Sequence, residues 1–180
     1  MGHMNKHQLL EIDTTSTVKF STTELKKMNV WLNYASVTLE KLITEGLIKG
    51  KGPKKIRISL LLCGDARIKQ INREFRDKDK VTDVLSFPSN DDLIKTWKTQ
   101  SFDGELFLGD LAICIPQLKR QARQFNIGFW DEFVHLFFHG VLHLWGYDHE
   151  RSAKDEVIMQ KWEDRAMEHL SVLKKKAKTI

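Results

Sequence analysis

The sequence has few cysteines, few prolines and no long apolar run. The two cysteines, Cys63 and Cys114, stand far apart inside apolar segments and form no C-x-x-C pair. We therefore interpret them as buried core thiols, compatible with a reducing compartment, and not as nucleophiles or metal ligands. The best apolar run, residues 58–63, is far shorter than the roughly 18 residues that a membrane helix needs. No secretory signal is visible, so we expect a cytoplasmic protein without a membrane segment.

The length of 180 residues suits one domain with a proper core. Hydrophobic residues make up 41% and charged residues 29%, which is an ordinary soluble composition. The net charge of +5 owes much to lysines near the end of the chain, so it says little about partners. We interpret residues 174–180 as a flexible basic tail and residues 1–4 as a cloning remnant. The whole chain, residues 1–180, is expected to form one domain that includes these two ends.

Hydrophobic periodicity predicts strands that alternate with helices. A helix is expected to start with Thr22 or Thr23 as its N-cap, and Gly146 is expected to end another helix. A strand is expected to be bulged at Gly109. Strands are predicted at about 12–20, 55–63, 84–87 and 105–115, and helices after Thr22, after Asp65, and at about 116–125, 131–145 and 153–173. This order, without repeats or a linker, indicates a small α/β protein built of α+β layers.

Three histidines at offsets 0, 4 and 10 occur in HGVLHLWGYDH, residues 139–149. His139 and His143 share one helix face, and Gly146 permits the turn that returns His149. His135 lies on the same stripe, but it is separated from His143 by about 12 Å along the helix axis. Zinc–nitrogen bonds of roughly 2 Å cannot converge across that span. We therefore predict His139, His143 and His149 as metal ligands, and His135 as a packed residue or a hydrogen-bond partner of a ligand.

Three neutral imidazoles favour one Zn²⁺ ion, although Ni²⁺ and other transition metals accept the same ligands. Three protein ligands leave a coordination position open, which is typical of a catalytic site. The spacing is that of the zinc protease signature H-E-x-x-H-x-x-G-x-x-H, but Gly140 replaces the glutamate that acts as base. Peptide hydrolysis is therefore disfavoured, whereas hydrolysis of a phosphate substrate stays open. The glycine permits close approach of a backbone or a substrate.

Three segments resemble those of the YbeY family of rRNA maturation factors. HGVLHLWGYDH resembles its H-G-x-L-H-L-x-G-Y-D-H signature, with Trp145 where an aliphatic residue is common. NREFRDKDKVTDVLSFP, residues 72–88, resembles the block N-x-x-[YF]-R-x-K-D-x-x-T-D-V-L-S-F-P, and LGDLAIC, residues 108–114, resembles the L-G-D-[IL] strand. The resemblance spans about residues 55–162. It implies a mixed sheet of about four strands packed with about five helices, with the metal site in a cleft formed by a helix and the turn after it.

The family consists of zinc-dependent endoribonucleases. The resemblance therefore implies a single-strand-specific, metal-dependent endoribonuclease that acts in rRNA maturation, at the 3′ end of 16S rRNA, and in ribosome quality control. It places the metal ligands on His139, His143 and His149, and the basic residue implicated in RNA work on Arg76. The implied partners are rRNA and the small ribosomal subunit, with ribosomal proteins or GTPase assembly factors as further candidates.

Basic residues near Arg76 support an RNA substrate on physical grounds. The planar guanidinium of Arg76 binds phosphate oxygens bidentately and keeps its charge, so we predict a catalytic role for it beside His143. Lys78 and Lys80 follow closely and are expected to contact the RNA backbone.

Asp83 and Asp110 each have two interpretations: a turn or cap residue, or a hydrogen-bond partner that orients a ligating histidine. Asp148 stands next to His149 in the sequence, and it is a candidate to orient that ligand or to act as a base. Two other functions also fit parts of the sequence. One is a non-catalytic ribosome assembly factor with a structural metal, and the other, on the spacing alone, is a metallopeptidase.

Overall fold

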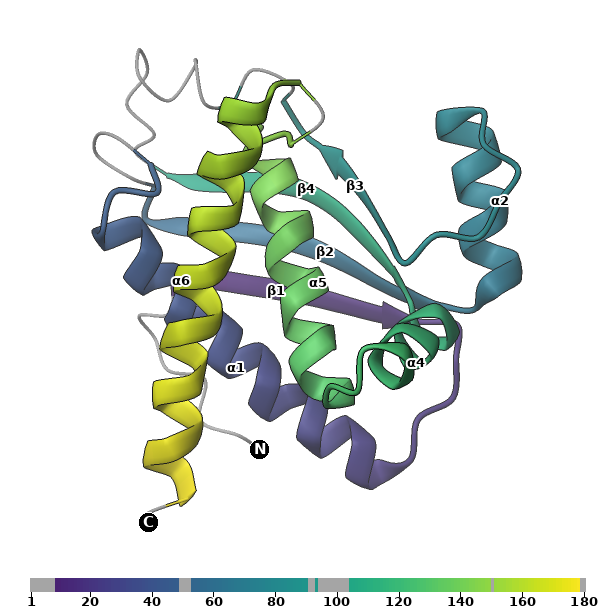
Figure 1. Ribbon diagram of the computed structural model, residues 1–180, viewed down its shortest axis with the longest axis horizontal. Coiled ribbons are helices and arrows are strands. Elements are labelled where there is room, and N and C mark those ends of the chain that lie inside the picture. The colour runs from purple at the N-terminus through teal and green to yellow at the C-terminus, as the bar shows by residue number, and fades with distance from the viewer. Residues whose placement is uncertain (1–8, 49–52, 91–92, 94–103, 150, 179–180) are drawn as a thin grey trace.

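The computed structural model describes all residues except 1–8, 49–52, 91–92, 94–103, 150 and 179–180. The described strands and helices follow the predicted alternation (Figure 1). In chain order they are β1 (Leu10–Ser16), α1 (Thr22–Thr44), β2 (Lys55–Cys63), α2 (Asp65–Arg76), β3 (Val84–Pro88), β4 (Glu105–Cys114), α4 (Ile115–Gln124), α5 (Phe129–Leu144) and α6 (Ala153–Lys178). The sequence also predicts a polar loop from Pro88 to Asp103, and part of it lies outside the described residues.

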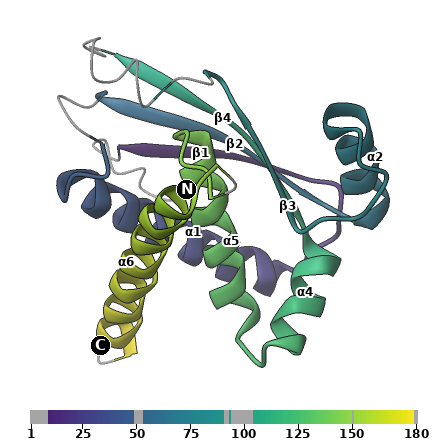
Figure 2. The same ribbon diagram turned by 45° about the horizontal axis from the view of Figure 1, so that its top comes forward.

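The described strands form one four-stranded mixed sheet in the order β1-β2-β4-β3. β1, β2 and β4 run parallel, and β3 pairs with β4 in the antiparallel direction at the edge. Helices α1, α4, α5 and α6 lie on one side of the sheet, and α2 lies apart from them (Figure 2). The mixed sheet and helical layers confirm the predicted fold class. Among the described helices, none has the length and apolarity to cross a bilayer.

Helix α2 covers the other face of the sheet. Its buried Ile68 and Ile71 pack against Cys63, Leu85 and Cys114, which form a small apolar cluster distinct from the main core. The main core lies between the sheet and the remaining helices. Because both faces of the central strands are covered, β2 and β4 are apolar along most of their length.

The bulge predicted at Gly109 is present. The pairing of β2 with β4 shifts between Arg57, opposite Phe107, and Ile58, opposite Gly109, so that Leu108 is the extra residue. Gly109 has φ of +142°, and a Cβ atom there would lie 2.3 Å from the carbonyl oxygen of Phe87. Only glycine accommodates this backbone at so close a contact.

Two predicted boundaries near the N-terminus are wrong. β1 ends at Ser16, several residues earlier than predicted. The Ser16 hydroxyl accepts a hydrogen bond from the backbone N–H of Val18 and donates one to the Val18 carbonyl, which turns the chain. The N-cap of α1 is Ser21, one residue before the predicted threonines. The Ser21 hydroxyl accepts from the N–H of Glu24, whose carboxylate accepts from the N–H of Ser21 at 2.8 Å, which is a capping box.

Helix α6 extends to Lys178, beyond the predicted end near residue 173, so residues 174–178 of the predicted basic tail are helical. Lys174 explains the extension. Its Nζ atom lies 2.5 Å from Oδ1 of Asp131 and 5.1 Å from the ring centre of Trp31. These contacts hold the end of α6 against α5 and α1, where the sequence shows only a run of lysines.

The sequence pattern of α6 predicts an inward face formed by Val157, Trp162, Ala166 and Leu170. Trp162, Ala166 and Leu170 are buried as expected, but Val157 is 69% exposed. Val157 stands two residues before the buried Met159, and two residues correspond to more than half a helical turn. Its side chain therefore lies on the opposite side of the helix.

Candidate metal centre

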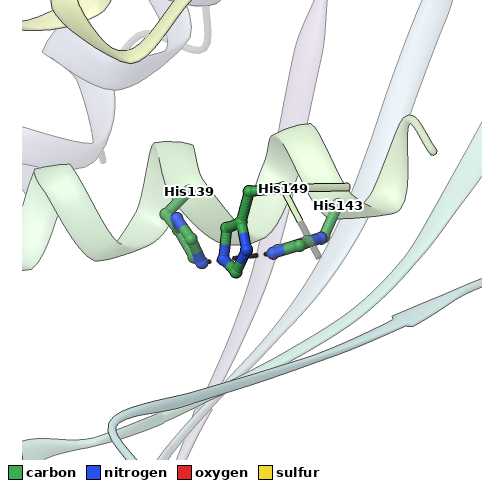
Figure 3. Close-up of side chains that lie close together, drawn as sticks. All are labelled: His139, His143 and His149. Atoms are coloured by element: carbon green, nitrogen blue, oxygen red, sulfur yellow. Dashed lines mark hydrogen bonds between the residues drawn. The ribbon is translucent and has the colours of Figure 1, made fainter. Parts of the chain in front are cut away.

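Three imidazole rings converge at the end of α5. His139 and His143 lie one turn apart on α5. His149 belongs to the segment after this helix, and its ring lies between the other two rings (Figure 3). Nε2 of His143 is 3.2 Å from Nε2 of His139, and the ring centres of the three residues are 4.7 to 5.2 Å apart. One ring nitrogen of each lies within 4.8 Å of the others, so the cluster can hold a metal ion.

The turn after α5 brings His149 back. The N–H of Gly146 donates to the carbonyl of His143 at 2.9 Å, and the N–H of Tyr147 donates to the carbonyl of Leu142 at 3.0 Å. This pair of bonds is a Schellman motif, which needs the left-handed backbone that Gly146 adopts with φ of +89°. The Tyr147 hydroxyl donates to the carbonyl of Leu47, which ties this turn to the turn that follows α1. The sequence correctly predicted a site formed by a helix and the turn after it.

Glu163 of α6 is a neighbour of the cluster that the sequence analysis missed. It is only 7% exposed, and its Oε1 atom accepts a hydrogen bond from Nδ1 of His139 at 2.7 Å. Because a carboxylate accepts, the proton sits on Nδ1 and the lone pair of Nε2 faces the other imidazoles. A signal was present, since Glu163 is four residues after the buried Met159 and three before the buried Ala166. A charged residue at an inward helical position indicates a buried partner.

Burial lowers the pKa of His143 to about 4, with further contributions from His139 and His149. At neutral pH His143 is therefore neutral, which is the form that binds metals. Three imidazoles close together, with one tautomer fixed by a carboxylate, suit a divalent transition metal such as zinc. Ligand type alone does not distinguish zinc from nickel.

His135 lies outside the cluster, as predicted. Its Nδ1 atom is 3.5 Å from Oε2 of Glu132 on the same helix. The hydrogen bond with Glu132 raises the pKa of His135, and burial opposes that shift. His135 thus pairs with a glutamate of its own helix, and not with a predicted metal ligand as one of its two interpretations expected.

Asp83 serves the backbone around β3. Its Oδ1 atom accepts from the N–H of Val84, and its Oδ2 atom accepts from Nε2 of Gln121, both at 2.8 Å. It therefore ties the start of β3 to α4. Asp148 pairs with Arg151 at 3.0 Å and lines the same cleft as the histidines. Both aspartates line the cleft, and Asp148 is the one next to a predicted ligand in sequence.

Asp110 lies away from the histidines, so the prediction that it orients a ligand is wrong. The bulge at Leu108 and Gly109 reverses which residues of β4 face α5. Before it, Leu106 and Leu108 belong to the main core, and after it Leu111 does. Asp110 is exposed on the opposite face. Strict alternation from Leu106 would have placed it toward α5.

Gly140 faces the sheet. A Cβ atom at this position would lie 2.7 Å from Cδ2 of Leu111 and 3.2 Å from Oγ of Ser86. The absence of a side chain at Gly140 therefore makes room for side chains of β4 and β3. The prediction that it allows close approach of a substrate or another backbone is wrong. A glutamate here would point into the packed layer between α5 and the sheet, where it could not act as a base.

A cleft of about 780 Å³ connects the histidines with the basic residues predicted to bind RNA. Its lining includes the three imidazoles together with Arg76, Lys78 and Lys80 from the end of α2 and the link to β3. Nη2 of Arg76 donates to the carbonyl of Ser86 at 2.9 Å, and its Cζ atom is 5.8 Å from the ring centre of Phe87. The structure thus brings the predicted metal ligands and the predicted RNA-binding residues to one cleft, which the edge strand β3 also lines.

Comparisons with known proteins show the fold and the family. The solution structure of TM1509 from Thermotoga maritima superposes with a TM-score of 0.57 at 24% identity and covers 93% of each chain, which shows a shared fold. The protein named endoribonuclease YbeY of Leptospira interrogans is 46% identical over 124 residues, covering 64% of this chain and 88% of the relative. That of Persephonella marina is 41% identical over 115 residues, covering 64% of this chain and 71% of the relative. The family model described as endoribonuclease YbeY matches residues 20–171, and with most of its length matched, this chain belongs to the YbeY family.

Proposed function

We propose that this chain is a metal-dependent endoribonuclease that cleaves single-stranded RNA during rRNA maturation. The observation that carries the proposal is the shared cleft, which is lined by three convergent imidazoles together with Arg76, Lys78 and Lys80. The names of its relatives support the same activity. We further propose that the substrate is the 3′ end of 16S rRNA, and that the protein works in the cytoplasm and in ribosome quality control.

The residues at and beside the cleft have different proposed roles. His139, His143 and His149 would hold one zinc ion, which when bound supplies a Lewis acid for a phosphoryl oxygen. Arg76 uses one N–H of Nη2 on the Ser86 carbonyl, which leaves further donors of its guanidinium for phosphate oxygens. Lys78 and Lys80 add positive charge that attracts the RNA backbone. Glu163 keeps the proton of His139 on Nδ1.

The two alternative functions have less support. A peptidase of the H-E-x-x-H type needs a glutamate that reaches the metal, and the corresponding Gly140 faces the sheet. A purely structural metal in an assembly factor would normally have four protein ligands in a closed site. The cluster found among the described residues has three members and opens onto a cleft. Both observations favour catalysis on RNA.

Purified wild-type protein and His143→Ala, each with measured metal content, test the proposal on single-stranded rRNA fragments. We expect the variant to lose both metal and cleavage, because one of three imidazoles is removed. His135→Ala is the matched control, since His135 lies on α5 outside the cluster, and it should keep both. Cleavage by metal-free His143→Ala at the wild-type rate would point to a contaminating nuclease and refute the enzymatic proposal.

The proposed partners are the small ribosomal subunit and, beyond it, ribosomal proteins or GTPase assembly factors. Cells that carry only His143→Ala should accumulate 16S rRNA with an extended 3′ end, while the variant still sediments with the small subunit. Normal 16S rRNA ends in those cells would instead favour the non-catalytic assembly factor.

A further inference from the structure

An exposed aromatic side chain stands at the cleft on the last turn of α2. Phe75 is 66% exposed, although phenylalanine gains much from burial. Its ring contacts Phe87 of β3 edge to face, with 5.3 Å between ring centres and 66° between planes. Both rings line the same cleft as the three histidines. The side chain is thus held by a neighbour while most of its surface faces solvent.

Basic side chains line the cleft together with this pair of rings. Arg76 is the next residue along the chain, and its Cζ atom lies 5.8 Å from the ring centre of Phe87. Lys78 and Lys80 line the cleft beyond it. Aromatic rings interleaved with cations along a groove are the usual means of holding a single strand, because cations bind the phosphates and rings stack on the bases.

We infer that Phe75 is a stacking platform for an unpaired nucleobase of the RNA whose phosphate Arg76 binds. The inference rests on the proposed function and adds a base-binding subsite to it. In a duplex both faces of each base are covered by neighbouring bases, so only an unstacked base can lie on the ring. Phe75 would therefore select single-stranded RNA at the cleft, whereas the lysines and Arg76 bind any backbone.

Four variants separate stacking from other roles of the side chain. Phe75→Ala removes the ring, Phe75→Leu keeps an apolar contact for Phe87, and Phe75→Trp keeps an aromatic face. Phe125→Ala is the matched control, because Phe125 is 61% exposed at the end of α4 and is not among the residues that line the cleft. Thermal unfolding of each variant checks that it folds.

Binding is measured by fluorescence anisotropy with the full chain in EDTA, so that the RNA stays intact. The probes are a short single-stranded RNA, its duplex, and the same strand with abasic sites. We expect Phe75→Ala and Phe75→Leu to weaken single-strand binding roughly tenfold, and Phe75→Trp and Phe125→Ala to bind like the wild type. The abasic strand should bind equally to wild type and Phe75→Ala, with an unchanged salt dependence, because phosphate contacts remain.

Two results would overturn the inference while the proposed function stands. If Phe75→Ala bound the single strand as tightly as Phe125→Ala, the ring would serve another contact, such as a protein partner. If Phe75→Ala lost affinity equally for the abasic strand, the ring would support the backbone site and not a base. Absence of RNA binding by the wild type, both in EDTA and with zinc added, would be a different failure, since it refutes the proposed function and this subsite with it.

Discussion

At the scale of single residues, Glu163 controls the orientation of His139. A carboxylate that is 7% exposed and 2.7 Å from an imidazole nitrogen leaves that ring one favourable tautomer and one favourable rotation. The other nitrogen then faces His143 at 3.2 Å. In a metal site such an outer partner both aims its ligand and makes it more basic, so its charge matters as well as its shape.

Glu163→Gln removes the charge while keeping an oxygen that can accept from Nδ1 of His139. We expect the dissociation constant for zinc to rise about 10- to 100-fold, because the ligand becomes less basic and less firmly oriented. Competition with a chromophoric chelator measures it without any RNA. Asp164→Asn is the matched control, since this neighbouring carboxylate is exposed and bonded to Gln160. Equal zinc affinities in the two variants would contradict the role of Glu163.

Sequence patterns predicted the residues of this site that depend on local geometry. His139 and His143 follow from the helical repeat, and Gly146 and His149 follow from the turn that glycine permits. Glu163 belongs to another helix, and spacing within one segment carries no information on which helix packs beside it. Gly140 was recognised as unusual for a protease, but its neighbours are side chains of β3 and β4. Such contacts arise only when the layers pack.

At the scale of elements, two helices end in the same way. After α5, Gly146 has φ of +89°, and after α1, Gly46 has φ of +97°. The N–H of Gly46 donates to the carbonyl of Ile43, and the next N–H donates to that of Leu42, which repeats the Schellman pattern. A Cβ atom at Gly46 would meet nothing within 4 Å. The two ends differ chiefly in function, because only the turn at Gly146 returns a metal ligand.

Gly146→Ala and Gly46→Ala form a matched pair that exploits this difference. Each places an alanine in the left-handed region, so each should lower the free energy of unfolding by about 1–2 kcal/mol. Urea denaturation measures this. Only Gly146→Ala should also weaken zinc binding, because relaxation of its strained turn moves His149 away from His139 and His143. If both variants bound zinc like the wild type, the turn would not position the ligand.

Strand details mark the limit of prediction at this scale. Gly109 in β4 indicated a bulge. The sequence did not indicate that the bulge would turn Asp110 away from α5. The end of β1 was placed too late, because IDTTSTVKF is rich in β-formers and the bond of Ser16 to Val18 competes with the ladder. Side chains that bond their own backbone decide such boundaries.

At the scale of the whole molecule, the thiol reactivity of Cys63 and Cys114 measures unfolding of the sheet. They are paired positions on the central strands β2 and β4, both fully buried in the apolar cluster under α2. Burial raises the pKa of Cys63 to about 11 and that of Cys114 to about 12. At pH 8 a thiol of pKa about 11 is ionised in roughly one molecule per thousand, so the native protein should react slowly with thiol reagents.

Thiol labelling therefore tests whether the metal site and the sheet unfold as one unit. The histidines and Glu163 belong to α5 and α6 with the turn between them, whereas the thiols are packed against α2 on the other face of the sheet. In a cooperative domain, zinc at about 100 times its dissociation constant stabilises the fold by about 2.7 kcal/mol and should slow labelling of both cysteines about 100-fold. The rates are measured at pH 8 by absorbance of the released reporter, with His143→Ala as the control that zinc should leave unchanged. If saturating zinc left the labelling rate of the wild type unchanged, the sheet would open while the metal site stays folded. The domain would then consist of two parts that unfold independently.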